Sequence, residues 1–169
     1  MNTRDAIHTR RSVRAFSPQP VPATAIRELV EAAMQAPSAG NEQPWQFVVI
    51  DDRALLDGIP EILPYAPMCR VAPLAILVCG DMNEAHHTGY WVQDCSAATQ
   101  NLLLMAHDLG LGAVWTGVYP NKERVSGLQE MLRLPAGIVP LALVVIGIPT
   151  DQAEPVARFR ENRVHHNGW

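Results

Sequence analysis

The chain has 169 residues, of which 48% are hydrophobic, and this size is sufficient to bury the core of one globular domain. Its formal net charge of -4 disfavours a nucleic-acid-binding domain, which normally presents a basic surface. The longest apolar run, residues 137–149, contains Pro140 and is shorter than the ~18 residues of a membrane span. The charged N-terminus lacks the apolar segment of a signal peptide, and the three cysteines lack metal or redox spacing. We therefore expect one cytoplasmic domain over residues 1–169, with reduced thiols, that binds neither nucleic acid nor membrane.

Two helices are predicted before the first strand. Residues 3–10 are expected to form a short helix capped by Thr3, which places the arginines that follow at the exit of this helix. Three prolines at alternate positions, Pro18, Pro20 and Pro22, then keep the chain extended. In residues 23–34 the apolar side chains recur with the spacing of one face of an amphipathic helix.

Four short runs rich in β-branched and aromatic residues are predicted to be buried strands: residues 46–50, 74–79, 112–118 and 141–146. Between the second and third run, residues 86–109 predict a long helix whose broad apolar face suits burial on two sides, including against a second subunit. Asn121 is expected to cap a further helix that ends at Arg133. Strands that alternate with helices are, by themselves, typical of a parallel sheet.

Basic residues gather near the two ends of the sequence. Seven of the thirteen Lys and Arg residues lie there: Arg4, Arg10, Arg11, Arg14, Arg158, Arg160 and Arg163. Because a guanidinium group offers a planar fork of donors, this pattern indicates that the two segments converge on a small anion. The alternative is a solvated basic surface. The tail, residues 151–169, also carries Phe159 and Trp169, which predicts that it packs on something, such as another protomer.

The loop at residues 37–45 is the second candidate for ligand binding. Gly40 allows a ligand to approach the backbone closely, while Asn41 and Gln43 each offer a donor and an acceptor, as the edge of a heteroaromatic ring requires. The alternative is an ordinary loop in which Trp45 anchors the core.

Other common sites are disfavoured by the sequence. The Gly110-Leu111-Gly112 stretch precedes a strand instead of opening a helix, so it does not fit a dinucleotide-binding fingerprint, and no phosphate-binding P-loop is present. The pairs at 86–87 and 165–166 are adjacent histidines, whose side chains diverge, so we predict no metal site. Ser12 and Ser38 have no identifiable partner base, and we predict no catalytic side chain.

Three segments together resemble the FMN-dependent nitroreductase family in order and spacing: residues 10–16 (RRSVRAF), 36–47 (APSAGNEQPWQF) and 110–117 (GLGAVWTG). The segment 93–102 is also similar to the long central helix of that family, and residues 163–165 with Trp169 resemble the tail of its short members. The resemblance covers essentially the whole chain.

The resemblance implies an α+β fold: a three-layer α/β/α sandwich around a mixed, mostly antiparallel sheet, in a homodimer with two FMN molecules at its interface. It implies cofactor-binding residues at Arg10, Arg11, Ser12, Arg14, Trp115, Thr116 and Gly117 in one subunit, and at Pro37, Ser38, Asn41 and Gln43 in the loop of the other. Arg158 and Arg160 match a basic pair that closes on the FMN phosphate, with Arg163 as the alternative.

By this resemblance the protein is an enzyme that takes a hydride from NADH or NADPH and reduces a nitroaromatic, a quinone or a similar acceptor. Arg10 or Arg14 is the candidate to stabilise the negative charge that reduction leaves at the flavin N1 and O2 edge. The alternative is a flavin-binding sensor, carrier or reservoir without turnover, and a specialised flavin reaction is a third possibility. Longer members supply Asn and Lys side chains just before the second strand, where this chain has Tyr65, Ala66, Pro67 and Met68.

Overall fold

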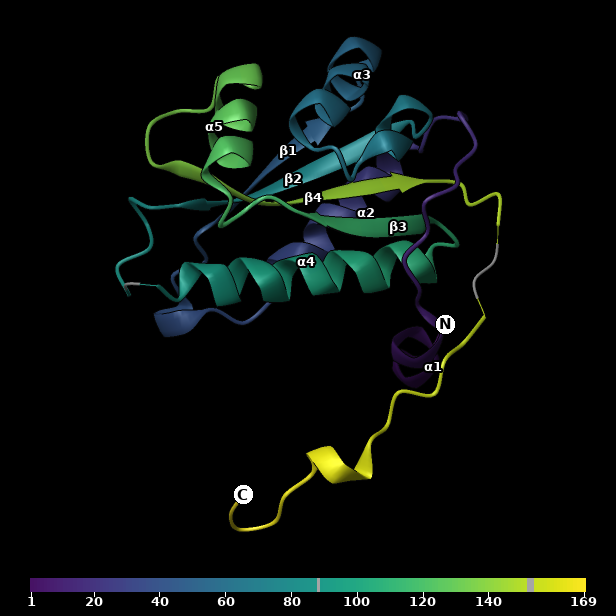
Figure 1. Cartoon of the computed structure of the whole chain (residues 1–169), viewed down its shortest axis with the longest axis vertical. Helices are drawn as coiled ribbons and strands as arrows, with labels where there is room; N and C mark the ends of the chain where they lie inside the picture. Colours follow the sequence, from purple (N-terminus) through teal and green to yellow (C-terminus); the bar gives the residue numbers. More distant parts are fainter. Residues whose placement is uncertain (88, 152–153) are drawn as a thin grey trace.

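The computed structural model describes residues 1–87, 89–151 and 154–169. Its centre is a four-stranded sheet of order β1-β2-β4-β3, built from β1 (Trp45–Ile50), β2 (Leu74–Asp81), β3 (Gly112–Gly117) and β4 (Ile138–Gly147). One face is covered by α2 (Ala23–Met34) and α4 (Trp91–Asp108), and the other by α3 (Arg53–Ile62) and α5 (Lys122–Met131) (Figure 1). The short helix α1 (Thr3–Thr9) lies beside the end of α4. The three-layer sandwich is therefore confirmed.

Every neighbouring pair within this sheet is antiparallel, so the parallel sheet that strand and helix alternation alone would suggest is wrong. The reason is the place of β4. It lies between β2 and β3 and pairs with both, so those two strands share a direction without touching. Outside the named strands, the isolated bridge between Ser12 and Ala113 is parallel.

The core consists of two apolar clusters, one on each face of the sheet. Alternate residues of β2 point to opposite faces, so Ile76 and Val78 join the α2 and α4 side, while Leu77 and Cys79 join the α3 and α5 side. Both central strands are almost wholly buried, as continuous apolar runs predict. Cys69, Cys79 and Cys95 are buried free thiols, in agreement with the sequence, and burial raises the pKa of each to about 12.

The four predicted helices correspond to α1, α2, α4 and α5, but their boundaries do not all agree with the prediction. The predicted helix 23–34 is confirmed, and Asn121 caps α5 by accepting from Arg124 N. Thr3 is not a cap: the Asn2 side chain accepts from Asp5 N, and α1 ends at Thr9. The helix predicted to begin at residue 86 begins at Trp91, and α5 ends at Met131, before Arg133 adopts a positive φ of 50°.

The tail leaves the body of the molecule beyond α1 (Figure 1). Phe159 and Trp169 are 80% and 104% exposed on the chain by itself, and Trp169 stacks on His165 at a centroid distance of 4.3 Å. Phe159 and Trp169 therefore do not pack on the body of their own chain. Among the described residues, no helix combines the length and the apolar character that crossing a membrane requires.

Candidate functional site

The arginine segment is held against the free edge of the sheet. It follows directly after α1, and Val13 N donates to the Ala113 carbonyl of β3 at 3.0 Å. Gly112 permits this close approach, because a Cβ atom there would lie 2.7 Å from Val13 Cγ1. The sequence Arg10-Arg11-Ser12-Val13-Arg14 is thus fixed along β3 by a backbone contact, and within it the Arg11 guanidinium donates to the carbonyls of Arg10 and of the tail.

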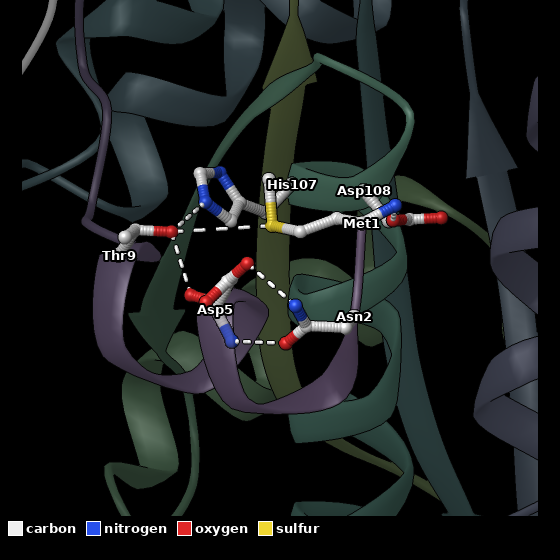
Figure 2. A network of polar contacts seen from close by, with 6 residues as sticks. All are labelled: Met1, Asn2, Asp5, Thr9, His107 and Asp108. Atoms are coloured by element: carbon white, nitrogen blue, oxygen red, sulfur yellow. Dashed lines mark hydrogen bonds and ion pairs between the residues drawn. The ribbon is translucent and has the colours of Figure 1, made fainter.

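Helix α1 is fastened to the last turn of α4 by the polar contacts of Figure 2. The Met1 amine pairs with Asp108 at 2.6 Å, and Thr9 Oγ1 lies 2.7 Å from His107 Nε2. The Thr9 hydroxyl has one proton, and its donation to the Asp5 carbonyl at 2.7 Å would make His107 Nε2 the donor of the second contact. Burial lowers the pKa of His107, and the charges of Arg10 and Arg11 lower it further.

A cavity, here called the arginine cavity, opens beside this junction. It has a volume of about 340 Å³, and its walls include Thr9, Arg10, Arg11 and His107. Burial lowers the pKa of Arg10, and the neighbouring charges of Arg158 and Arg11 add to the effect. Arg11 Nε donates to the Glu154 carbonyl at 3.2 Å.

The two arginine segments therefore lie close together in one chain, and their convergence on a small anion stays a prediction. In the described part of the chain, no carboxylate lies within 4.0 Å of Arg10, Arg11 or Arg158. Asp151 also lines the arginine cavity, so a small dianion such as a phosphate would offset the positive charge that its carboxylate does not balance. Arg160 also lies in this tail, where it precedes the single turn Glu161–Arg163 and is exposed.

A second cavity, here the sheet-edge cavity, lies where β3 ends. Its volume is about 270 Å³, and it brings together Arg14, Tyr65, Met68, Val114, Trp115, Thr116, Gly117 and Arg124. The sequence predicted Arg14 and the stretch 115–117, but it did not identify Arg124 or the contribution of Tyr65. Arg124 is an isolated cation on an amphipathic helix, and no local signal distinguishes it from a solvated surface residue.

The free edge of β3 supplies backbone groups to the sheet-edge cavity. Ala113 turns its carbonyl away from β4 to accept from Val13 N, and alternation along a strand then directs the backbone groups of Trp115 and Gly117 outward as well. A Cβ atom at Gly117 would meet nothing within 4 Å, and the buried Thr116 hydroxyl has no hydrogen-bond partner in the described chain. This edge offers open space and polar groups, as a heteroaromatic ring requires.

The loop predicted as the second candidate forms a tight polar turn. Its single helical turn spans Ala39–Asn41, and Gly40, Asn41 and Gln43 all have positive φ. Ser38 Oγ accepts from Gln43 N at 3.0 Å, and Gln43 Nε2 donates to Asn41 Oδ1 at 3.1 Å. The Gln43 side chain thus supports Asn41, while Asn41 itself and Pro37 are exposed.

Two acidic side chains anchor this loop to the body of the molecule. Asp94 Oδ1, in the first turn of α4, accepts from Ala39 N at 3.0 Å. Glu42 accepts from His87 N at 3.0 Å and also contacts the His87 ring. Burial alone would raise the pKa of the Glu42 carboxyl, but the hydrogen bonds from His87 outweigh it and hold this pKa below its ordinary range.

One chain does not bring the loop and the arginines together. The loop is attached at Asp94 near the start of α4, whereas the arginine cavity lies at His107 near its end. These two residues are thirteen positions apart, about 20 Å along the axis of the helix. The loop and the arginine cavity therefore lie at opposite ends of α4.

Comparisons with known proteins identify the family of the chain. The model of the nitroreductase family matches residues 7–66 and 61–148. The chain belongs to the nitroreductase family. A protein of Methanothermobacter thermautotrophicus, provisionally named NADH dehydrogenase/NAD(P)H nitroreductase, is 44% identical over 100% of this chain and 88% of its own length.

Solved structures of this family share the fold of the whole chain. A Parabacteroides distasonis protein of the same provisional name superposes with a TM-score of 0.95 at 42% identity, over 100% of both chains. A provisionally named nitroreductase of Desulfovibrio desulfuricans, solved in complex with FMN, superposes with a TM-score of 0.85 at 31% identity, over 100% of this chain and 99% of its own.

Proposed function

We propose that this nitroreductase-family protein is an FMN-dependent oxidoreductase that takes a hydride from NADH or NADPH and reduces a nitroaromatic, a quinone or a related small acceptor. The observation that carries this proposal is the pair of cavities on either side of the arginine segment. One has the guanidinium groups that suit a phosphate, and the other has an open backbone edge that suits a flat heterocycle. The names of the relatives, which include an FMN reductase [NAD(P)H] of Bacillus subtilis, support the same activity.

The residues of the two cavities would bind different parts of FMN. Arg10 and Arg11, which line the arginine cavity, would hold the FMN phosphate there together with Arg158, whose charge acts on Arg10. Ser12, at the bridge to β3, lies between the two cavities, and the backbone edge of Trp115 to Gly117 would orient the ring. When bound, FMN supplies the chemistry of hydride and electron transfer, and the protein positions FMN and supplies charges around it.

Arg14 is the residue proposed to stabilise the reduced cofactor. It lines the sheet-edge cavity, and in the described chain it has no carboxylate within 4.0 Å. A fixed guanidinium at the ring edge stabilises negative charge there more effectively than water does, because it needs no reorientation when the charge forms.

We further propose that the functional unit is a homodimer in which the loop of one subunit completes the site of the other. The loop residues Pro37, Ser38 and Asn41 lie about 20 Å along α4 from the arginine cavity of their own chain, too far to line the same part of it. A second copy of the chain is the simplest source of a loop at the required place.

The decisive experiment is spectroscopic. The purified protein, reconstituted with FMN where needed, is expected to show the absorption of an oxidised flavin that bleaches when NADH or NADPH is added without oxygen. Heat release and chromatography should identify the flavin as FMN. Recovery of FAD, or failure to retain FMN, would contradict the cofactor assignment, and a bound flavin that neither donor bleaches would instead support a carrier or sensor.

A further inference from the structure

Arg124 is placed where its positive charge does not help the fold. It lies in the first turn of α5, next to the positive end of the helix dipole, which disfavours a cation. Among the described residues, no carboxylate lies within 4.0 Å of its guanidinium. Its side chain donates from Nη1 to the Gly117 carbonyl at 3.0 Å, which fixes the group at the wall of the sheet-edge cavity. Since a guanidinium has five N–H donors, most of them are left for a ligand.

Tyr65 orients the same guanidinium from the other side. The Arg124 Cζ atom lies 5.4 Å from the centre of the Tyr65 ring, within the range of a cation–π contact. Tyr65 is nevertheless 72% exposed, so its ring is available to a second aromatic group that enters the cavity. Together the two side chains form a cationic and aromatic wall beside the free edge of β3.

The proposed binding of FMN does not account for Arg124. The phosphate has Arg10, Arg11 and Arg158, and the ring edge has Arg14, so a further guanidinium at the same cavity exceeds what the cofactor requires. Arg14 and Arg124 line one cavity of about 270 Å³, so an anion that enters it can meet two guanidinium groups. A second anion, one that arrives with a reactant, is suited to this cavity.

We propose that Arg124 and Tyr65 form a subsite that binds the anionic group of a reactant next to the flavin. Two reactants carry such a group: an aromatic acceptor that has a carboxylate, and the nicotinamide donor, whose pyrophosphate is negatively charged. The proposal rests on the assigned FMN-dependent function, and it adds a specificity-determining role for two residues outside the predicted cofactor set.

The test compares charged and neutral reactants in the FMN-loaded Arg124→Gln variant. The KM values for NADH, for 4-nitrobenzoate and for methyl 4-nitrobenzoate are measured separately from kcat. If the subsite holds the acceptor, the KM for 4-nitrobenzoate should rise about ten- to a hundredfold, while the KM for the ester stays unchanged. If it holds the donor, the KM for NADH should rise by a similar factor. Either result supports the subsite and identifies its occupant.

An equilibrium titration provides a readout that does not depend on turnover. Benzoate added to the oxidised FMN-loaded protein should perturb the flavin absorption band, with an affinity at least tenfold weaker in Arg124→Gln than in the wild-type protein. Arg124→Lys should retain part of the effect because it keeps the charge but loses the planar fork. Lys122→Gln is the matched control, since it removes one positive charge from the same helical turn without lining the cavity.

Two outcomes would overturn the subsite. The first is an equal change of KM for charged and neutral reactants, and the second is a loss of FMN affinity in Arg124→Gln with unchanged KM values, which would assign this residue to the cofactor. Failure of the function itself would look different, because the wild-type protein would then retain no flavin or hold a flavin that neither donor reduces.

Discussion

Burial and like-charge repulsion both disfavour the charged form of Arg10. Its guanidinium is partly withdrawn from solvent, and both burial and the nearby charges of Arg158 and Arg11 lower its pKa. An anion at the arginine cavity would convert this unfavourable environment into a favourable one. Cofactor affinity and apoprotein stability should therefore respond to Arg10 in opposite directions.

We expect Arg10→Ala to weaken FMN binding by about one to two orders of magnitude, because it removes a charge-assisted contact worth about 1.5 to 3 kcal/mol. The apoprotein should be at least as stable as wild type, since like-charge repulsion is relieved. Fluorescence quenching during FMN titration and thermal unfolding of the apoprotein measure the two effects. Arg4→Ala, exposed on α1 and outside the cavity, is the control. Unchanged affinity with a less stable apoprotein would mean that Arg10 serves the fold instead.

His107 should make the stability of the apoprotein depend on pH. Its pKa in the folded chain lies below the ordinary value of 6.5, chiefly because of burial and then because of Arg10 and Arg11. The unfolded chain therefore binds this proton more readily, so stability is fully present above about pH 6.5 and declines as the pH falls toward the folded pKa. Denaturant unfolding of the wild-type protein and of His107→Gln between pH 5 and 8, about the range in which histidine titrates, should show a smaller decline in the variant. Identical slopes would exclude this linkage.

At the scale of elements, the position of the arginine segment depends on its contact with β3. Gly112→Ala would introduce a Cβ atom 2.7 Å from Val13 Cγ1 and 3.2 Å from Pro149 Cβ, so the segment must move away from the sheet. We expect FMN affinity to fall about tenfold or more, as it would after the loss of a charged contact. Gly58→Ala is the matched control, because its Cβ atom would meet only the flexible end of Met131, at 3.0 Å. Equal FMN affinity in the two variants would show that the placement of this segment does not depend on Gly112.

The sequence predicted the elements whose signals are local. The apolar runs of the four strands, the amphipathic helix α2 and the Asn121 cap were all recognisable, because each depends on spacing within a few residues. Helix α3 was missed. Its buried residues Leu56 and Ile59 have helical spacing, but Gly58 and Pro60 obscure the pattern, and Pro60 removes one backbone donor.

Non-local features could not be predicted in the same way. The insertion of β4 between β2 and β3 depends on pairing between segments far apart in the chain, and this pairing decides that the sheet is antiparallel. Arg124 and Tyr65 likewise meet only because α5 and the turn after α3 pack on the same face of the sheet. For the candidate site, the sequence therefore identified the residues carried by a motif but missed those that the tertiary fold contributes.

At the scale of the whole molecule, the separation of the loop and the arginine cavity along α4 is the basis for the proposed homodimer. The exposed tail aromatics, Phe159 and Trp169, lie on a segment that begins next to the arginine cavity, where Arg11 donates to the Glu154 carbonyl. A tail that packed on a second subunit would cover these aromatic rings and bring Arg158 and Arg160 toward the same ligand. Assembly and cofactor binding would then depend on the same residues.

The final prediction is that dimerisation and FMN binding are one linked process. A site whose walls come from two chains is complete only in the dimer, so FMN should stabilise the dimer by mass action, by about 2.7 kcal/mol at a hundredfold excess over its dissociation constant. Removal of residues 151–169 takes away Arg158, Arg160 and the exposed tail aromatics together. The sedimentation coefficient and the flavin content, measured over a range of protein concentrations, should therefore fall in parallel in the truncated protein. The double variant Phe159→Ala, Trp169→Ala separates the two roles, because it keeps both arginines and should weaken the dimer first. A truncated protein that stays dimeric and fully loaded would show that the tail has neither role, and a monomer that binds FMN as tightly as the dimer would contradict the shared site.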